Sequence, residues 1–244
     1  TDGHLVMAYL FLKAQGLAGK LVADIRIDGA GKKVTRSDNC RVSDLSVSSD
    51  NLTFTYEAKS LPYPIDTSYY DNEKHTQADA LSVIPFMDEM NYEGLSVSGL
   101  SDGYYGLTIG GEFIGRFTAR ELERGINMAL LQNTPQYKQA MKIRQMNEER
   151  WLKERKMREF YWVEYNLMRK TGMLWACNEA AVDTLRKYRP HDIFLQWNGD
   201  LWLQYMHKGI REDCVNEQQD LVNQIYEQNK PIPLRIEIKK FTDL

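Results

Sequence analysis

One polar segment of the sequence brings together residue types that bind metals. His75 follows Asp71 by four residues and Glu73 by two. Imidazole and carboxylate groups are common zinc ligands, so this spacing raises the question of a metal site. Carboxylates and one histidine in a polar loop are more often simply solvated, and the three cysteines form no CxxC pair and have no histidine at a metal-ligand spacing. We therefore predict no metal and no cofactor.

A second set of candidates is the aromatic stretch between His191 and His207, which contains Trp197 and Trp202. Aromatic side chains combine a large apolar face with defined stacking geometry, so both tryptophans are candidate substrate-binding residues for a sugar ring. Aromatics at these spacings more often fill a core, and the core interpretation is favoured.

The first element that must position such residues is a helix over residues 1–16, with a cap at Thr1 or Asp2 and a stop at Gly16. Residues 5–12 are eight consecutive apolar residues. Crossing a bilayer takes roughly 20, so we predict no membrane span. A helix that is apolar on every side must be covered by other protein.

The next part of the chain has mainly β signals, and its second half is mainly helical. Thr118 and Glu121 have the spacing of a capping box, and Thr134-Pro135 begins a long helix. Residues 192–206 are ambiguous, because Asn198-Gly199 weakly favours a β-hairpin while the length also suits a broken helix. The expected strands are 21–27, 41–48, 51–58, 94–100, 104–109, 112–117 and 233–240, with 94–117 forming a meander; the expected helices are 77–92, 119–124, 135–170, 173–189 and 217–229, the third and fourth pairing as a hairpin.

Composition places the chain among ordinary globular proteins. It has 244 residues, of which 43% are apolar and 27% charged, with a formal net charge of −3. A nucleic-acid binder is expected to be basic, so this balance argues against a nucleic-acid partner. A gapped apolar stripe along the predicted long helix, which includes Trp151, Leu152 and Tyr161, indicates either a buried face or a homodimer contact, and burial is favoured.

Two blocks of sequence resemble a known family. Gly3-His4-Leu5-Val6-Met7-Ala8 is similar to the segment that follows the catalytic Asp-x-x-His block in SGNH/GDSL-type hydrolases and begins the last helix of their flavodoxin-like sheet. Residues 95–109, 117–129 and 134–136 resemble the accessory C-terminal region of many bacterial proteins of this lipase/acylhydrolase-like group. The resemblance implies a serine esterase that hydrolyses acyl esters, with acyl groups on carbohydrates as a plausible substrate. It also implies a periplasmic or extracellular location.

The catalytic blocks of that family are absent from the sequence. The only Gly-Asp pair is followed by Leu201 rather than by serine, and no Asp-x-x-His occurs. His4 corresponds to a second, downstream histidine of the family pattern, so a local hydrogen bond is favoured over a role as the catalytic base. Asn127 is a candidate for reaching a neighbouring hydrolase site, although formation of a turn is favoured.

These observations predict an α+β protein with three segments. Residues 1–36 would be the end of an α/β hydrolase domain, residues 37–117 a small antiparallel β-rich domain, and residues 118–244 a helical extension with a final strand. The chain would be the non-catalytic C-terminal part of an SGNH-type esterase whose catalytic domain is its main partner. A glycan-binding module and a structural or oligomerising unit are the alternatives.

Overall fold

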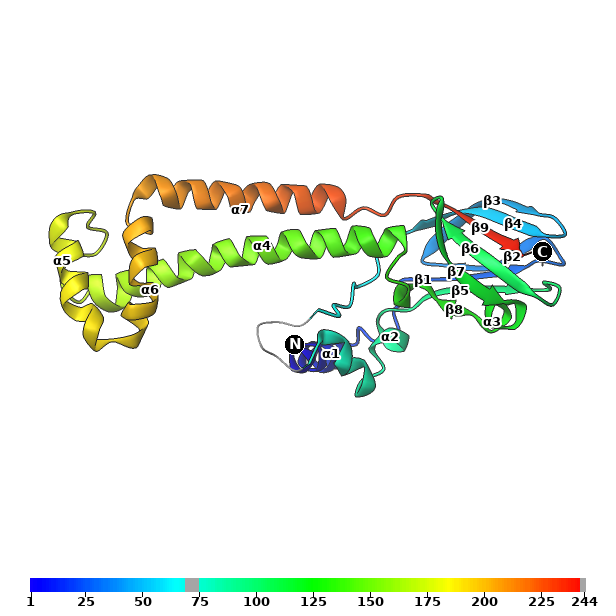
Figure 1. Ribbon diagram of the computed structural model, residues 1–244, viewed down its shortest axis with the longest axis horizontal. Helices are drawn as coiled ribbons and strands as arrows, with labels where there is room; N and C mark the ends of the chain where they lie inside the picture. The colour runs from blue at the N-terminus through cyan, green and yellow to red at the C-terminus, as the bar shows by residue number, and fades with distance from the viewer. Residues whose placement is uncertain (69–74, 242–244) are drawn as a thin grey trace. The chain divides into compact units, whose positions relative to one another are not determined.

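The computed structural model describes residues 1–68 and 75–241 of the chain. These residues form two compact units. Unit 1 comprises residues 1–142 together with the end of the chain from Asn229, and unit 2 comprises Ile143–Gln228 (Figure 1). Unit 1 holds the sheets and unit 2 is helical, so the α+β class expected from the sequence is confirmed.

Two sheets make up most of unit 1. Sheet A has the order β2-β1-β5-β8, and sheet B has the order β3-β4-β9-β6-β7. Neighbouring strands are antiparallel except β1 and β5, which run parallel with Ile25 opposite Leu95. The strands are β1 (Ala23–Asp28), β2 (Lys33–Asp38), β3 (Cys40–Val47), β4 (Asn51–Ala58), β5 (Glu93–Ser98), β6 (Tyr104–Ile109), β7 (Glu112–Thr118), β8 (Ile126–Asn127) and β9 (Leu234–Lys240).

The predicted hairpin of β3 and β4 and the strands near 104–109, 112–117 and 233–240 are confirmed. The meander over 94–117 is wrong, because β5 belongs to sheet A while β6 and β7 pair in sheet B. Strand β5 lies between β1 and β8, and four of its six residues are buried. A strand with so much of its surface covered suits the interior of a sheet, which explains why it leaves its sequence neighbours.

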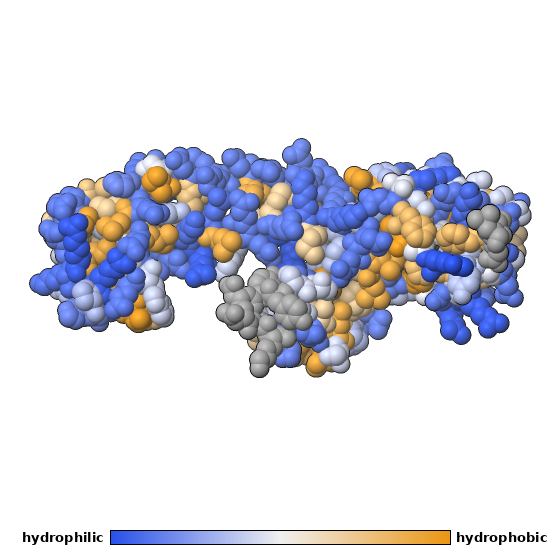
Figure 2. Space-filling view, viewed as in Figure 1, coloured by the Kyte–Doolittle hydropathy of each residue, from blue (hydrophilic) through white to orange (hydrophobic). Residues whose placement is uncertain are grey.

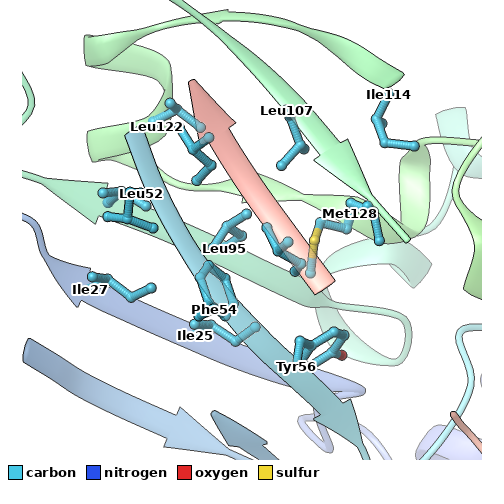
Figure 3. Packing of buried hydrophobic residues seen from close by; sticks show 14 of the residues in the cluster. Ile25, Ile27, Leu52, Phe54, Tyr56, Leu95, Leu107, Ile114, Leu122 and Met128 are labelled. Atoms are coloured by element: carbon cyan, nitrogen blue, oxygen red, sulfur yellow. The ribbon is translucent and has the colours of Figure 1, made fainter. Parts of the chain in front are cut away.

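The main hydrophobic core combines side chains of both sheets. Figure 3 shows Ile25 and Leu95 from sheet A lying close to Phe54 from sheet B. Helix α3 (Ala119–Arg124) adds Leu122, and Thr118 and Glu121 form the predicted capping box at its start. Because β9 lies between β4 and β6, the last strand of the chain completes the middle of sheet B.

A smaller cluster fixes the N-terminal helix in unit 1. Helix α1 (Asp2–Ala14) confirms the helix predicted over residues 1–16, and it packs beside the 3₁₀ segment Gln77–Ser82. The single helix expected over 77–92 is wrong. The 3₁₀ segment ends at Ser82, and after Pro85 a separate short helix, α2 (Phe86–Glu89), begins. Proline removes a backbone donor and clashes with the preceding turn, so it interrupts a helix.

Unit 2 contains α-helices, a π-helical turn and the 3₁₀ helix Arg189–His191. Helix α4 (Pro135–Val163) begins in unit 1, continues into unit 2 and is followed by a π-helical turn at Glu164–Met168. The other helices are α5 (Glu179–Tyr188), α6 (Ile193–Tyr205) and α7 (Lys208–Gln228). Their shared core contains Phe160, Val163, Leu185 and Trp202. In the described part of the chain, no helix is both long enough and apolar enough to span a bilayer.

Three expectations for unit 2 need correction. The helix predicted over 173–189 begins only at Glu179, where the Asn178 side chain accepts a hydrogen bond from the backbone of Ala181. The final helix is longer than the predicted 217–229. The weakly favoured hairpin over 192–206 is wrong, because α6 is one continuous helix that contains Asn198-Gly199.

The glycine in α6 serves packing rather than a turn. A Cβ atom at Gly199 would lie 3.1 Å from Nε of Arg189. That guanidinium donates two hydrogen bonds to the Asp200 carboxylate, at 2.6 Å and 2.7 Å. Glycine therefore allows Arg189 to approach the helix, which is why an Asn-Gly pair that is typical of a hairpin occurs inside a helix here.

Candidate functional site

The predicted site residue Asn127 is partly buried in unit 1, at the end of β8. Its Oδ1 accepts a hydrogen bond from the Glu93 backbone at 3.0 Å, and its Nδ2 donates to the carbonyls of Met87 and Asn91, both at 3.2 Å. The side chain thus joins β5 to the segment before it. Within the described residues, the hydrogen bonds of this side chain all go to backbone groups, including that of Ala129, which fits a structural role.

The same contact leads to a buried carboxyl group that the sequence analysis missed. Glu93 begins β5 and has no exposed surface. The Tyr56 hydroxyl of β4 donates to its Oε1 at 2.8 Å, and Nε2 of Gln136 in α4 lies 3.3 Å and 3.4 Å from its two oxygens. The sequence signal that could have identified it is the position of this glutamate directly before the strand predicted over 94–100.

Burial controls the protonation of this group. Removal from water raises the pKa of Glu93 to about 7, against the smaller lowering effect of the hydrogen bonds from Tyr56 and Gln136. Both hydrogen-bond partners are neutral, so no opposite charge stabilises the carboxylate. Through these hydrogen bonds Glu93 links sheet A to sheet B and to α4. Its carboxyl group gains or loses a proton near neutral pH.

Unit 2 contains a second buried glutamate. Glu164 begins the π-helical turn and is 1% exposed. Its Oε1 accepts from Nε1 of Trp202 at 2.8 Å, and its Oε2 accepts from the backbone of Trp175 at 2.8 Å. Trp202, a predicted substrate-binding residue, is fully buried and has no surface left for stacking on a ligand.

Trp197, the other predicted tryptophan, lies in an open groove of unit 2. The groove has a volume of about 580 Å³, within the roughly 300–1,000 Å³ of ordinary ligand sites. Trp197 is 67% exposed there. The structure therefore separates the two predicted tryptophans of α6, with one in the groove and the other in the core. The groove is lined by Trp151, Arg155, Arg158, Glu159, Trp162, Phe194, Trp197 and Asn198.

The rings in the groove are not arranged as a flat row. Trp162 and Phe194 are tilted by 38° at a centroid distance of 5.2 Å, and Phe194 and Trp197 are nearly perpendicular at 79°. Nε of Arg155 donates to Glu159 at 2.7 Å, so its charge is partly compensated. The groove thus offers aromatic edges and faces with partly paired charges, rather than a coplanar stacking platform.

The homodimer contact on the long helix, the less favoured alternative to burial, stays a prediction. Of the apolar stripe on α4, Phe160 is fully buried in unit 2, whereas Trp151 is 46% and Leu152 50% exposed. The stripe is therefore divided between a core part and a surface part. Figure 2 shows mainly hydrophilic residues on the visible surface of α7, and hydrophobic residues among α5 and α6.

Three of the histidines make contacts within the chain. His4 accepts or donates a hydrogen bond with the Thr1 hydroxyl at 3.1 Å, which is the local role favoured by the sequence. His75 lies 3.6 Å from Asp79, and His207 lies 3.4 Å from the Cys177 sulfur. Within residues 1–68 and 75–241, no histidine ring is hydrogen-bonded to a serine hydroxyl, the contact that activates a serine nucleophile.

Of the three residues that suggested a metal site, only His75 belongs to the described part of the chain. Asp71 and Glu73, which suggested a site together with His75, lie outside the described residues. Elsewhere, the described side chains form no group of three or more His, Cys, Asp and Glu with a metal-binding arrangement. The expectation of no metal and no cofactor stays a prediction.

Comparison with known proteins finds one solved structure that is similar over almost the whole chain. No curated protein matches the chain. A solved structure of a gut microbial diltiazem-metabolizing enzyme matches with a TM-score of 0.92 and 39% sequence identity, covering 98% of this chain. The match covers 54% of that enzyme, so this chain spans about half of its length.

The helical unit has a family match of its own. Residues 141–230 match the family model described as the diltiazem deacetylase C-terminal helical domain. These boundaries differ from those of unit 2, at 143 and 228, by two residues at each end. The chain is therefore similar to an esterase-like C-terminal region, and its residues 141–230 are similar to the diltiazem deacetylase helical domain.

Proposed function

We propose that this chain is the non-catalytic C-terminal part of an ester hydrolase similar to diltiazem deacetylase. The observation that carries the proposal is the structural match with 39% identity over 98% of the chain. The whole protein would cleave an acyl ester with water, releasing a carboxylic acid and an alcohol. An acetyl ester is the expected substrate class, because the related family is a deacetylase.

The chemical step would use a serine nucleophile outside these residues. The resemblance of residues 3–8 to an SGNH-type sequence supports this assignment, and the histidine contacts in this chain support a non-catalytic role for it. In such a reaction a histidine takes the serine proton as the hydroxyl oxygen attacks the ester carbonyl, and water later releases the acyl group.

Two assays on the longer gene product and on this chain test the proposal. With p-nitrophenyl acetate, we expect hydrolysis by the longer protein and only the buffer rate with this chain. A fluorophosphonate probe, which reacts with activated serines, should label the longer protein alone. Hydrolysis or labelling by this chain would contradict its non-catalytic role, and an inactive, unlabelled longer protein would contradict the hydrolase.

A second candidate function is ligand binding in the aromatic groove of unit 2. The exposure of Trp197 at a groove of about 580 Å³ is the observation that favours it. The ligand would be a glycan, whose ring C–H groups contact aromatic faces. A change in tryptophan fluorescence on titration with acetylated oligosaccharides, lost in Trp197→Ala, would support this function. An unchanged titration in Trp197→Ala would exclude the groove.

A further inference from the structure

Helix α1 has apolar side chains on two opposite faces. Leu5 and Tyr9, one turn apart, are 4% and 3% exposed. Met7, Leu10 and Phe11 are 62%, 56% and 65% exposed. With 3.6 residues per turn, this second set lies roughly opposite the first. Among residues 1–68 and 75–241, therefore, side chains pack over only one of the two apolar faces.

Polar contacts fix the rotation of the helix about its axis. The Tyr9 hydroxyl donates to Glu89 of α2 at 2.7 Å, and Nζ of Lys13 donates to the same carboxylate at 2.8 Å. Hydrogen bonds from Lys13 and then Tyr9 lower the pKa of Glu89, so its charged form is favoured at neutral pH. Because Tyr9 and Lys13 bind Glu89, the opposite face of α1, with its exposed apolar side chains, is directed away from the rest of unit 1.

The uncovered surface extends along the whole helix. Gly3, Met7, Leu10, Phe11 and Ala14 recur at the spacings that place residues on one helical face, and all five are exposed. We call them the α1 outer face. None of them is polar or charged, whereas a helix at a solvated surface normally has polar residues there.

We propose that the α1 outer face docks against the part of the longer protein that is absent from this structure, namely its catalytic region. This proposal rests on the proposed function and adds the surface through which the two parts meet. The length of the related enzyme supports this occupant, because this chain accounts for only 54% of it. The remainder is a partner of domain size, and its contact surface would be apolar to match residues without charge.

Cysteine labelling in the longer protein tests the docking directly. Cys177→Ser removes the exposed native thiol, while Cys40 and Cys214 are buried. Leu10→Cys then reports on the α1 outer face, and Tyr226→Cys is the control, since Tyr226 is 69% exposed on α7. Met7→Cys is a second reporter in case Leu10→Cys does not fold. The labelling rate of the introduced cysteine with a maleimide dye is measured in buffer and in denaturing urea by mass spectrometry of its peptide, because urea also exposes Cys40 and Cys214.

We expect Leu10→Cys to label at least about ten-fold more slowly in buffer than in urea, at every protein concentration, while Tyr226→Cys labels at similar rates in both. Equal rates for Leu10→Cys in the two conditions would overturn the docking. Protection that disappears on dilution would overturn it as well, because a second copy would then be the occupant. A gene product that begins at Thr1 would also overturn it.

Ester hydrolysis measured on the same samples separates the two proposals. Protection of Leu10→Cys in a protein that does not cleave esters supports the docking and contradicts the proposed function. Fast labelling in an active esterase overturns the docking and leaves the function standing.

Discussion

At the scale of single residues, a buried glutamate makes the stability of unit 1 depend on pH. The pKa of Glu93 is about 7 in the folded protein, against 4.5 for an ordinary glutamate. Between these values the folded state retains a proton that the unfolded state has lost. Its stabilising contribution is therefore complete below pH 4.5 and is lost as pH rises through about 7.

Replacement of Glu93 by glutamine should remove this dependence. We expect the free energy of unfolding of unit 1 to fall by about 3 kcal/mol between pH 4.5 and 8 in the parent protein, and to lose that component in Glu93→Gln. Urea unfolding followed across this range provides the measurement. Glu57→Gln is the control, because Glu57 follows Tyr56 on β4 and its side chain is 37% exposed. An identical pH slope in Glu93→Gln and the parent would contradict the assignment.

At the scale of elements, α6 shows how a local signal is overridden. Asn198-Gly199 is typical of a hairpin turn, but the start of the segment has a strong helix signal in Asp192. Its Oδ1 accepts from the backbone of Phe194 at 2.8 Å and of Leu195 at 3.2 Å. This cap and the burial of Trp202 against Glu164 both stabilise the helix, and they override the local turn preference.

Removal of this cap should weaken unit 2. We expect Asp192→Ala to lower the free energy of unfolding of unit 2 by about 1 kcal/mol, because two backbone donors lose their acceptor. Thermal unfolding followed by far-ultraviolet circular dichroism checks this. Asp220→Ala, at an exposed position within α7, should change stability by less than about 0.5 kcal/mol. Equal effects of the two substitutions would argue against a capping role for Asp192.

At the scale of the whole molecule, the helical unit is inserted in the sequence between two segments that fold together into unit 1. Strand β9 follows unit 2 in sequence and pairs with both β4 and β6 in unit 1. The strand β1 near the N-terminus likewise pairs with β5 from the middle of the chain. The three segments 1–36, 37–117 and 118–244 stay a prediction about domain organisation.

This topology makes the last strand essential to unit 1. Ile236 is fully buried in β9, whereas Ile232, four residues earlier, is 56% exposed. We expect Ile236→Ala to destabilise unit 1 by about 2–5 kcal/mol, since it leaves a cavity between the sheets. Ile232→Ala should change stability by less than about 0.5 kcal/mol. Urea unfolding of both variants measures the difference, and a small effect at Ile236 would show that β9 contributes little to the core.

The sequence by itself determined the elements whose signals are local. The capping box at Thr118, the helix from Thr1 to Gly16, and the alternating strands β3, β4, β6, β7 and β9 depend on residues a few positions apart. The absence of a Gly-Asp-Ser turn was equally visible. The two apolar faces of α1 also follow from sequence, because helical spacing alone decides which residues share a face.

Only the tertiary structure decided which strands are neighbours and which polar residues are buried. No local sequence pattern predicts that β5 pairs with β1 rather than with β6, because strand pairing depends on burial between segments that are distant in sequence. The same reason separates Trp197 from Trp202, which are similar in sequence context but differ in exposure because α6 packs against Glu164 on one side. The raised pKa of Glu93 arises from removal from water by three separate elements, and such a surrounding exists only after folding.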